Sequence, residues 1–402
     1  MRALSSRRAA ARPGTAAAQP GAAPGRRVDP GAAARAAAVI AAAAVSLALP
    51  LWLSAANLTV YILTGLYAVT AIGLSLLMGY AGQVSLGQAV FFAIGAYTAA
   101  VLSLHGTPAA AALVAAPVLA AAVAAAVGVP ILRLRGHHLA FATLAFQLIV
   151  LSVISNTAFL GGGLGFTAIP ALGIGGAALT SARDYAWLVW AVTAAVLVLT
   201  LNIIRSRPGR ALRALATSEA AAESAGVPVV RYKLATFALS AAYAGFAGGI
   251  YVFFIGYASP DAFPVSLSVE LVVMVVIFGL GSVWGALLGA VGISVLVQVL
   301  TNVGTLPGMP QYMPTLLSYA AYGVILVVIM VFLPEGLLPA LRALWAAARR
   351  RGGTGGPREP AGPGRPAAAP PPAVALARSL VSSLRLSPAK GGKPPPEQTR
   401  RQ

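Results

Sequence analysis

The sequence predicts an all-α integral membrane protein, a polytopic helical bundle with about ten transmembrane passes, both termini in the cytoplasm and discontinuous glycine-rich segments. Of its 402 residues, 58% are hydrophobic and 9% are charged, whereas soluble domains carry about 25% charged residues. Long apolar stretches recur along the chain, and the Lys and Arg residues are confined to a few segments between them. The absence of cysteine excludes a disulfide framework and a cysteine-based metal site or nucleophile.

A membrane-spanning helix needs roughly 20 apolar residues. The predicted spans are 37–55, 58–79, 85–104, 108–132, 138–158, 185–204, 234–256, 266–281, 283–302 and 315–333. The eighth span is short and ends in glycine, so we expect it to be broken or only partly inserted. With the N-terminus in the cytoplasm, all but one of the 28 Lys and Arg residues fall on the inner side, the exception being Arg183. This distribution follows the positive-inside rule and predicts a multi-pass protein of the plasma or inner membrane.

The two ends of the chain, 1–36 and 341–402, are predicted to be disordered basic tails around a transmembrane domain at 37–340. Both are rich in Pro, Gly, Ala and Arg and have too little apolar surface to offset the entropy of ordering. The first tail lacks the apolar core of a secretory signal. The tails lack interleaved aromatic residues and flank a membrane domain, so we expect no binding of nucleic acid. Membrane lipid is the expected surrounding of the transmembrane domain.

The segment 205–233 is the longest charged stretch between strongly apolar ones. Pro208 suits a first helical turn and Gly226 suits a helix stop, so a short polar helix is predicted between them. A structured helix in water at this point is a natural docking element for a soluble partner. The alternative is a solvated basic loop that only fixes the topology.

A polar break without charge separates two apolar helices near the start of the bundle. It consists of Gly79, Gly82, Gln83, Ser85, Gly87 and Gln88. If the break reaches water, it is an ordinary tight turn. If it lies at membrane depth, its free backbone groups must line a cavity or be buried in protein.

Glu270 is the one acidic residue expected inside the apolar zone, where an ionisable group is costly and is a functional candidate. The alternative is a hydrated Glu270 at the outer interface. The glycine-rich outer segment 156–170 is interpreted either as a rim contacted by an external partner or as an irregular connection. His137 and His138 are expected at the interface rather than as metal ligands, because no acidic residue lies nearby in sequence.

Two absences narrow the function. No G-x-x-x-x-G-K-[ST] sequence is present to cradle the phosphates of ATP. No G-x-S-x-G elbow is present either, and the few acidic residues offer no His–Ser–Asp set. We therefore expect no catalytic residues, no cofactor and no metal in this chain.

Six segments of the chain carry a family pattern. They are G-Y-A-G-Q-V-S-L-G-Q-A-V-F-F-A-I-G-A-Y at 79–97, R-G-H-H-L-A-F-A-T-L-A-F at 135–146, G-G-G-L-G-F-T-A-I-P at 161–170, G-R-A-L-R-A-L-A-T-S-E-A-A-A-E-S-A-G at 209–226, M-V-V-I-F-G-L-G-S-V-W-G-A at 274–286 and P-E-G-L at 334–337. They resemble the membrane permeases of ABC importers for branched-chain amino acids, the longer of the two permease types in that system. The chain departs from the pattern at His138, Ala168, Leu215, Ala216, Phe278 and Ala286; the pattern has an aromatic residue in place of His138, glycine in place of Ala168 and a basic residue in place of Ala216.

The resemblance implies a transport subunit coupled to a separate ATPase, which binds the ATP. The expected ATPase-coupling residues are Arg207, Gly209, Arg210, Arg213, Glu219, Ala221, Ala222 and Gly226. The polar residues in the apolar segments predict a translocation path with Gly79, Gly82, Gln83, Ser85, Gly87 and Glu270. An extracytoplasmic substrate-binding protein is expected to dock on the outer loops at Gly161, Gly162, Gly165, Pro260 and Asp261. A second permease subunit is expected to pair with this one.

The expected mechanism is alternating access, in which closure of the partner ATPases moves the 207–226 helix and opens the bundle outward. One alternative is an importer of the same build for urea, short amides or a sugar. Another is an ion-coupled carrier or channel, which would be expected to carry acidic residues in several helices. A membrane enzyme is disfavoured because the chain offers no catalytic set.

Overall fold

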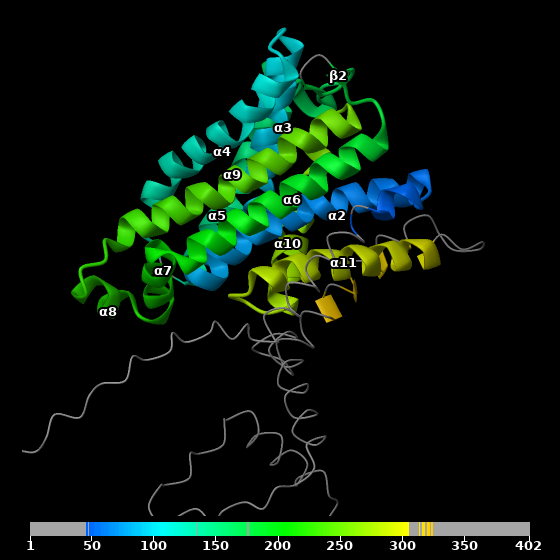
Figure 1. Cartoon of the computed structure of the whole chain (residues 1–402). Coiled ribbons are helices and arrows are strands. Elements are labelled where there is room, and N and C mark those ends of the chain that lie inside the picture. The colour runs from blue at the N-terminus through cyan, green and yellow to red at the C-terminus, as the bar shows by residue number, and fades with distance from the viewer. Residues whose placement is uncertain are drawn as a thin grey trace, which may run out of the picture. The chain divides into compact units, whose positions relative to one another are not determined.

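A computed structural model describes residues 46, 48–134, 136–174 and 177–304, and seven single positions between 313 and 324. These residues form a helical bundle (Figure 1), and seven helices within the described part are long and apolar enough to cross a membrane. The prediction of a polytopic helical membrane protein is confirmed in this coarser form. The count of ten passes and the placement of the termini stay predictions.

Several predicted segments lie outside the described residues. They are the two tails, 1–36 and 341–402, and most of the first and last predicted spans, 37–55 and 315–333. The domain boundaries at these ends therefore remain predictions.

The long helices follow the predicted spans closely. They are α2 (Ala55–Ser75), α4 (Ala109–Ile131), α5 (His137–Asn156), α6 (Ala182–Arg205), α9 (Val229–Ile255) and α11 (Val283–Gly304). Two helices are shorter, α3 (Gln88–Leu104) and α10 (Val265–Ile277). With the turn Pro260–Ala262 before it, α10 is one of the seven helices long and apolar enough to cross a membrane, so the expected broken or partly inserted span stays a prediction. Gly279 and Gly281 follow α10 with φ of 111° and 83°, which glycine tolerates and other residues rarely do.

The connections contain short elements. They are the 3-10 turns Leu49–Leu51, Ala158–Leu160, Gly162–Leu164 and Pro260–Ala262, the π-helical turn Leu76–Tyr80 that ends α2, helices α7 (Arg207–Thr217) and α8 (Glu219–Ser224), and the strands β1 (Gly173–Ile174) and β2 (Ala177–Ala178). The two strands form a small antiparallel hairpin in which Gly173 pairs with Ala178.

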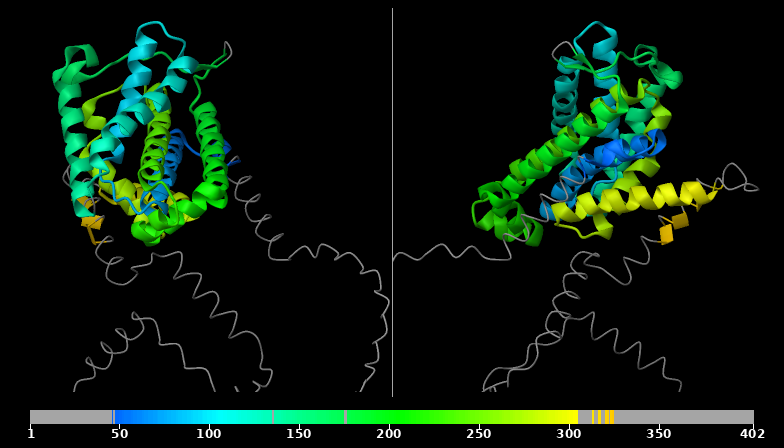
Figure 2. Two further views of the ribbon diagram at one scale, coloured as in Figure 1. Left: turned by 90° about the vertical axis from the view of Figure 1, so that its left-hand side faces the viewer. Right: turned by 45° about the vertical axis from the view of Figure 1, so that its right-hand side comes forward.

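Helix α9 is central to the packing. It lies against α3 and α4 and also contacts α2, which in turn packs on α6 and α11 (Figures 1 and 2). Small residues let α3 approach α9 closely: a Cβ atom on Gly95 would lie 2.0 Å from the Gly245 carbonyl oxygen, and one on Gly248 would lie 1.9 Å from that of Phe92. In lipid, where apolar burial gives helices little drive to associate, such close backbone packing holds them together.

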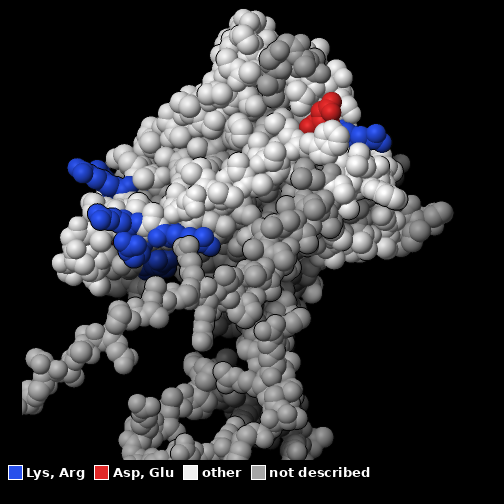
Figure 3. Space-filling model, in the orientation of Figure 1, with Lys and Arg blue, Asp and Glu red and all other residues white. Residues whose placement is uncertain are grey.

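The two ends of the bundle differ in charge. Among the described residues, every Lys and Arg except Arg183 lies at the end that carries α7, α8 and the segments 132–136 and 278–282. We call this the basic end; Figure 3 shows its Lys and Arg side chains gathered on one side of the molecule. The opposite end carries the loops 157–181 and 256–264.

Candidate functional site

Helix α7, at the basic end, is amphipathic. Its buried residues Gly209, Leu212 and Leu215 recur every three positions and therefore share one face. Gly209 is required there, because a Cβ atom would lie 2.1 Å from the Ile204 carbonyl oxygen. Arg213 donates a hydrogen bond from Nη1 to the same carbonyl oxygen at 3.2 Å. These contacts fix α7 against the end of α6.

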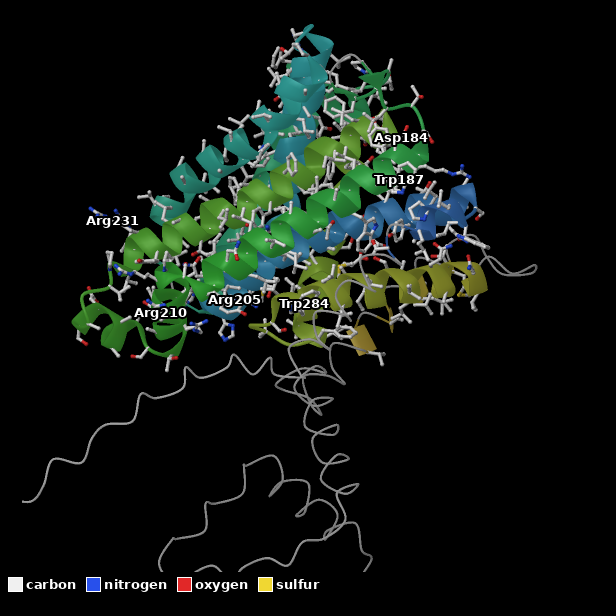
Figure 4. The ribbon with its side chains drawn as sticks, in the orientation of Figure 1. Asp184, Trp187, Arg205, Arg210, Arg231 and Trp284 are labelled. Carbon is white, nitrogen blue, oxygen red and sulfur yellow. The ribbon has the colours of Figure 1, made fainter. Side chains whose placement is uncertain are left out.

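The other faces of α7 are basic and open to solvent. Arg207, Arg210 and Arg213 are exposed, and Figure 4 places Arg205, Arg210 and Arg231 at the same end of the molecule. Arg207 and Arg210 are thus open to a second molecule, whereas Arg213, although exposed, is turned back to the Ile204 carbonyl oxygen.

The single helix predicted from Pro208 to Gly226 is wrong in one respect, because the structure has two helices with a break at Ser218. Ser218 is extended, with φ −160° and ψ 117°, and its hydroxyl accepts a hydrogen bond from the Ala221 N–H at 3.3 Å. A serine side chain that caps a helix start in this way favours a break over a continuous helix. The predicted stop at Gly226 is confirmed, since its φ is 79°.

Helix α8 is fixed to the bundle by a small apolar contact and an ion pair. Ala222 is buried, whereas Ala221 and Gly226 are exposed, so only part of the expected small-residue core faces outward. Glu219, the first residue of α8, forms an ion pair with Lys233 of α9. Glu219 is one of the predicted coupling residues, whereas the sequence pattern predicts no role for Lys233.

A groove of ≈ 570 Å³ separates α8 from the ends of α4 and α9. Its lining includes Gly128, Leu132, Arg133, Ala220, Glu223 and Lys233. Helix α8 therefore stands away from α4 and is joined to the bundle mainly at its first turn.

The predicted break between α2 and α3 is non-helical from 81 to 87. Its side chains alternate, since Gln83 and Ser85 are buried while Gly82 and Val84 are exposed. Neither the amide of Gln83 nor the hydroxyl of Ser85 has a hydrogen-bond partner among the described protein atoms. An unpaired buried amide is costly, so these two polar groups are candidates for a role other than stability.

Contacts with α9 fix the position of this break in the bundle. The Nε2 atom of Gln88 donates to the carbonyl and hydroxyl oxygens of Ser240 at 3.1 and 3.0 Å, and a Cβ atom on Gly73 would lie 3.2 Å from the same carbonyl oxygen. Ser240 lies near the middle of the 27-residue helix α9. The chain thus passes Ser240 in α2 and returns to it at the start of α3, while Gly82 between these contacts is exposed and lies beside Ala216 of α7. The break therefore extends from the interior of the bundle to its basic end, and its depth in the membrane stays a prediction.

Distant side chains satisfy the backbone where α3 begins. The Leu86 N–H donates to the Thr143 hydroxyl at 3.0 Å, and the Ala89 N–H donates to the Ser268 hydroxyl at 2.9 Å. Ser268 in turn donates to Oε1 of Gln147 at 2.7 Å. The free N–H groups at the start of a helix need hydrogen-bond partners when they lie inside an apolar bundle, and these side chains provide them.

Glycine is needed at three positions in and next to the break, for two different structural reasons. A Cβ atom on Gly79 would lie 2.1 Å from the Gly281 nitrogen, and one on Gly87 would lie 2.3 Å from the Thr143 carbonyl oxygen. Gly82 instead needs its backbone freedom, with φ of 66°. The break after α2 therefore packs directly on the break after α10, although the two are about 200 residues apart in sequence.

Glu270 lies inside α10, two residues beyond Ser268, and is half-buried. It is close enough to Tyr67 of α2 to interact with it electrostatically. Because Ser268 is level with the start of α3, Glu270 lies within the bundle rather than in the outer turn. Its place inside α10 agrees with the expected position, and a functional role for Glu270 stays a prediction.

The two outer loops predicted to contact a binding protein lie side by side. Phe166 and Ala258 form a bridge through hydrogen bonds of 2.8 and 3.0 Å, and a Cβ atom on Gly165 would lie 1.9 Å from the Ala258 carbonyl oxygen. Asp261 is exposed but Pro260 is buried. Gly161 and Gly162 are half-buried and have positive φ.

The two histidines at the start of α5 lie where the sequence predicts them. His137 and His138 are exposed at the start of α5, and no group of three or more potential metal ligands occurs within the part of the chain that the structure describes.

Comparison with known proteins decides the family. Residues 56–333 match the family model described as branched-chain amino acid transport system / permease component. The chain belongs to this family of permeases. The resemblance seen in its six motifs is thereby confirmed, and the permease is a transport component and a multi-pass membrane protein.

Curated relatives agree with this family. The permease is 30% identical over 329 residues to the high-affinity branched-chain amino acid transport system permease protein LivM of Escherichia coli (strain K12), covering 76% of this chain and 75% of LivM. It is 30% identical over 323 residues to LivM of Salmonella typhimurium, covering 74% and 73%. No solved structure shows significant similarity to the permease.

Proposed function

We propose that this chain forms the translocation path of an ABC importer for branched-chain or related hydrophobic amino acids, powered by a separate ATPase. Family membership and the names of its relatives support the transport system. One contact between the break and α7 supports the proposed mechanism. A Cβ atom on Gly82, in the break, would lie 3.6 Å from the Cα of Ala216 in α7, so the uncharged polar segment in the bundle touches the helix offered to the partner.

The basic end faces the cytoplasm in this proposal, with both termini on that side. Its support is the concentration of Lys and Arg at one end of the described bundle, as the positive-inside rule requires. ATPase subunits then bind α7 and α8, through Arg207, Arg210 and Arg213 and the exposed part of the Ala221–Gly226 segment.

The translocation path runs past the break. Gln83 and Ser85 supply polar groups without a partner in the described protein, and Glu270 supplies a carboxylate further into the bundle. Gly79, Gly82 and Gly87 allow the backbone to hold this shape. ATP-driven movement of α7 shifts the segment it touches, which alternates access between the two sides of the membrane. A partner can shift this equilibrium only through different affinities for the two states.

Two further partners belong to the proposal. An extracytoplasmic substrate-binding protein delivers the amino acid to the paired loops at 161–170 and 257–264. A second permease subunit completes the path. Exposed apolar side chains on α11, among them Leu288, Val295 and Val299, provide a face suited to lipid or to such a partner.

The test is solute uptake by proteoliposomes that contain the permease with its co-purified ATPase and binding protein. We expect ATP-dependent uptake of radiolabelled leucine, isoleucine or valine that persists when a protonophore abolishes ion gradients. Uptake of urea, an amide or a sugar instead would reassign the substrate and keep the importer. Uptake by the permease alone, driven by an ion gradient, would overturn the proposal.

A further inference from the structure

Lys233 is in an unusual position for a lysine. It is one of three lysines in the sequence and the one that lies within the described residues. It belongs to the second turn of α9, and its exposed fraction is 9%. Burial of an ammonium group is costly unless an opposite charge and hydrogen bonds compensate, so the position needs an explanation.

The carboxylate of Glu219 provides the compensation. Lys233 Nζ donates a hydrogen bond to Glu219 Oε1 within the ion pair. Glu219 begins α8, where the helix dipole also favours a negative charge. The pair therefore links the first turn of α8 to α9.

This link is important because α8 has few other attachments. The groove beside α8 separates it from α4, and Ala222 is the buried residue of its six. Helix α7, by contrast, is seated through Gly209, Leu212 and Leu215. A displacement of α8 thus reaches α9 through the Glu219–Lys233 pair as well as through the short connection 225–228.

Helix α9 connects this pair to the break. Ser240 follows Lys233 by seven residues, which places both on the same face of the helix, about 10 Å apart along its axis. Ser240 holds the Gln88 amide at the start of α3. One continuous helix therefore joins the ion pair at the basic end to the polar segment inside the bundle.

We propose that Lys233 is a positioning residue that transmits movement of α8 into α9 and from there to the Gln88 end of the break. The proposal rests on the proposed function, in which an ATPase moves α7 and α8. The competing interpretation is an ion pair that contributes only to folding stability. The two differ in their effect on the number of solute molecules moved for each ATP hydrolysed.

The absence of cysteine makes a chemical rescue experiment direct. The variant Lys233→Cys, purified alone, is treated with 2-aminoethyl methanethiosulfonate, which attaches an ammonium group, or with methyl methanethiosulfonate, which attaches a neutral one. Each form is then assembled with the ATPase and binding protein. The groove that borders position 233 gives the reagents access.

We expect the untreated Lys233→Cys variant and its neutral adduct to keep ATP hydrolysis. The number of solute molecules moved per ATP is expected to fall about tenfold in both, equal to about 1.4 kcal/mol. The ammonium adduct is expected to restore at least half of the original ratio. The charge exchange Glu219→Lys with Lys233→Glu is expected to restore it in part. An unchanged ratio, or equal rescue by the neutral adduct, would overturn the proposal.

A second measurement does not depend on the transport assay. A spin label is attached to the variant Ser224→Cys, at an exposed position on α8, in the isolated permease. We expect Lys233→Met to increase the mobility of this label, and Val230→Met, at an exposed neighbouring position, to leave it unchanged. Unchanged mobility in Lys233→Met would contradict the link even if the complex transports. Failure of uptake by the unmodified complex would count against the proposed function instead.

Discussion

The α7–α8 pair and the break at 81–87 are both polar regions of an apolar protein, but they are built in opposite ways. In α7 the apolar residues face the protein and the arginines face outward. In the break the polar side chains of Gln83 and Ser85 face inward, and Val84 is exposed. The first arrangement is that of a surface helix that meets a soluble partner. The second is that of a polar lining held within a bundle, where stability alone gives no reason for it.

The largest expected effect tests how the break is held. Gly79→Val places a side chain where a Cβ atom would already lie 2.1 Å from the backbone nitrogen of Gly281. We expect it to lower the free energy of unfolding by about 3 kcal/mol and to abolish uptake, as measured by thermal unfolding and proteoliposome transport.

Gly163→Ala is the matched control, since no atom lies within 4 Å of a Cβ atom there. Equal stability of Gly79→Val and Gly163→Ala would mean that the two breaks do not pack together as described.

The next effect separates function from stability in the break. Gln83→Leu removes an amide that has no hydrogen-bond partner among the described protein atoms, so we expect the free energy of unfolding to change by less than about 1 kcal/mol. Uptake is expected to fall about tenfold, a change of about 1.4 kcal/mol, and Ser85→Ala is expected to lower it in the same direction.

Val84→Ala, between these two positions but exposed, serves as the control. Full uptake at constant expression in both Gln83→Leu and Ser85→Ala would remove these residues from the translocation path.

The surface side of the comparison predicts a loss of partner binding without a loss of folding. We expect Arg210→Glu to reduce the co-purified ATPase about tenfold, or about 1.4 kcal/mol, because it reverses an exposed charge on α7. Gly226→Pro is expected to do the same, since proline requires a negative φ and Gly226 has φ of 79°.

Two variants are matched to these. Arg183→Glu reverses an exposed charge at the opposite end of the bundle, and Gly226→Asn keeps a residue that tolerates positive φ. Normal ATPase recovery with both Arg210→Glu and Gly226→Pro would exclude the coupling role of α7 and α8.

The smallest expected effect concerns the outer loops. Ala168 has φ of 56° and is the one residue other than glycine with positive φ in the described ranges; the family pattern has glycine there. We expect Ala168→Gly to raise the free energy of unfolding by about 1 kcal/mol without changing uptake. A decrease in thermal stability would contradict the view that the positive φ of Ala168 destabilises the protein.

The amphipathic surface elements were more predictable from sequence than the interior. Pro208 and Gly226 marked the limits of the coupling segment, because capping signals act within a few residues. The break at Ser218 was missed since good helix formers surround it. The glycines and uncharged polar residues of 79–88 located the other break, but its depth stayed open between two interpretations.

The position of this break in the bundle could not be predicted because it depends on distant partners. Gln88 meets Ser240 152 residues away, and Ala89 meets Ser268 179 residues away. Single serines in apolar helices give no local signal of such contacts. Lys233 was missed for the same reason: its partner Glu219 lies in another helix, and pairing across a groove has no sequence pattern.

The central claim is that the break and α7 touch and move together, and a disulfide between them tests it most directly. A Cβ atom on Gly82 would lie 4.0 Å from the Cβ of Ala216, within the range of about 3.5–4.5 Å that a disulfide requires. In the cysteine-free permease, Gly82→Cys is expected to cost about 1–2 kcal/mol of stability because position 82 has φ of 66°, so the reduced double variant Gly82→Cys with Ala216→Cys sets the reference rate of uptake. Oxidation is predicted to cross-link the pair and to stop ATP-driven uptake, and reduction is predicted to restore the reference rate. A pair that does not cross-link, or a cross-linked permease that transports at the full rate, would contradict the account.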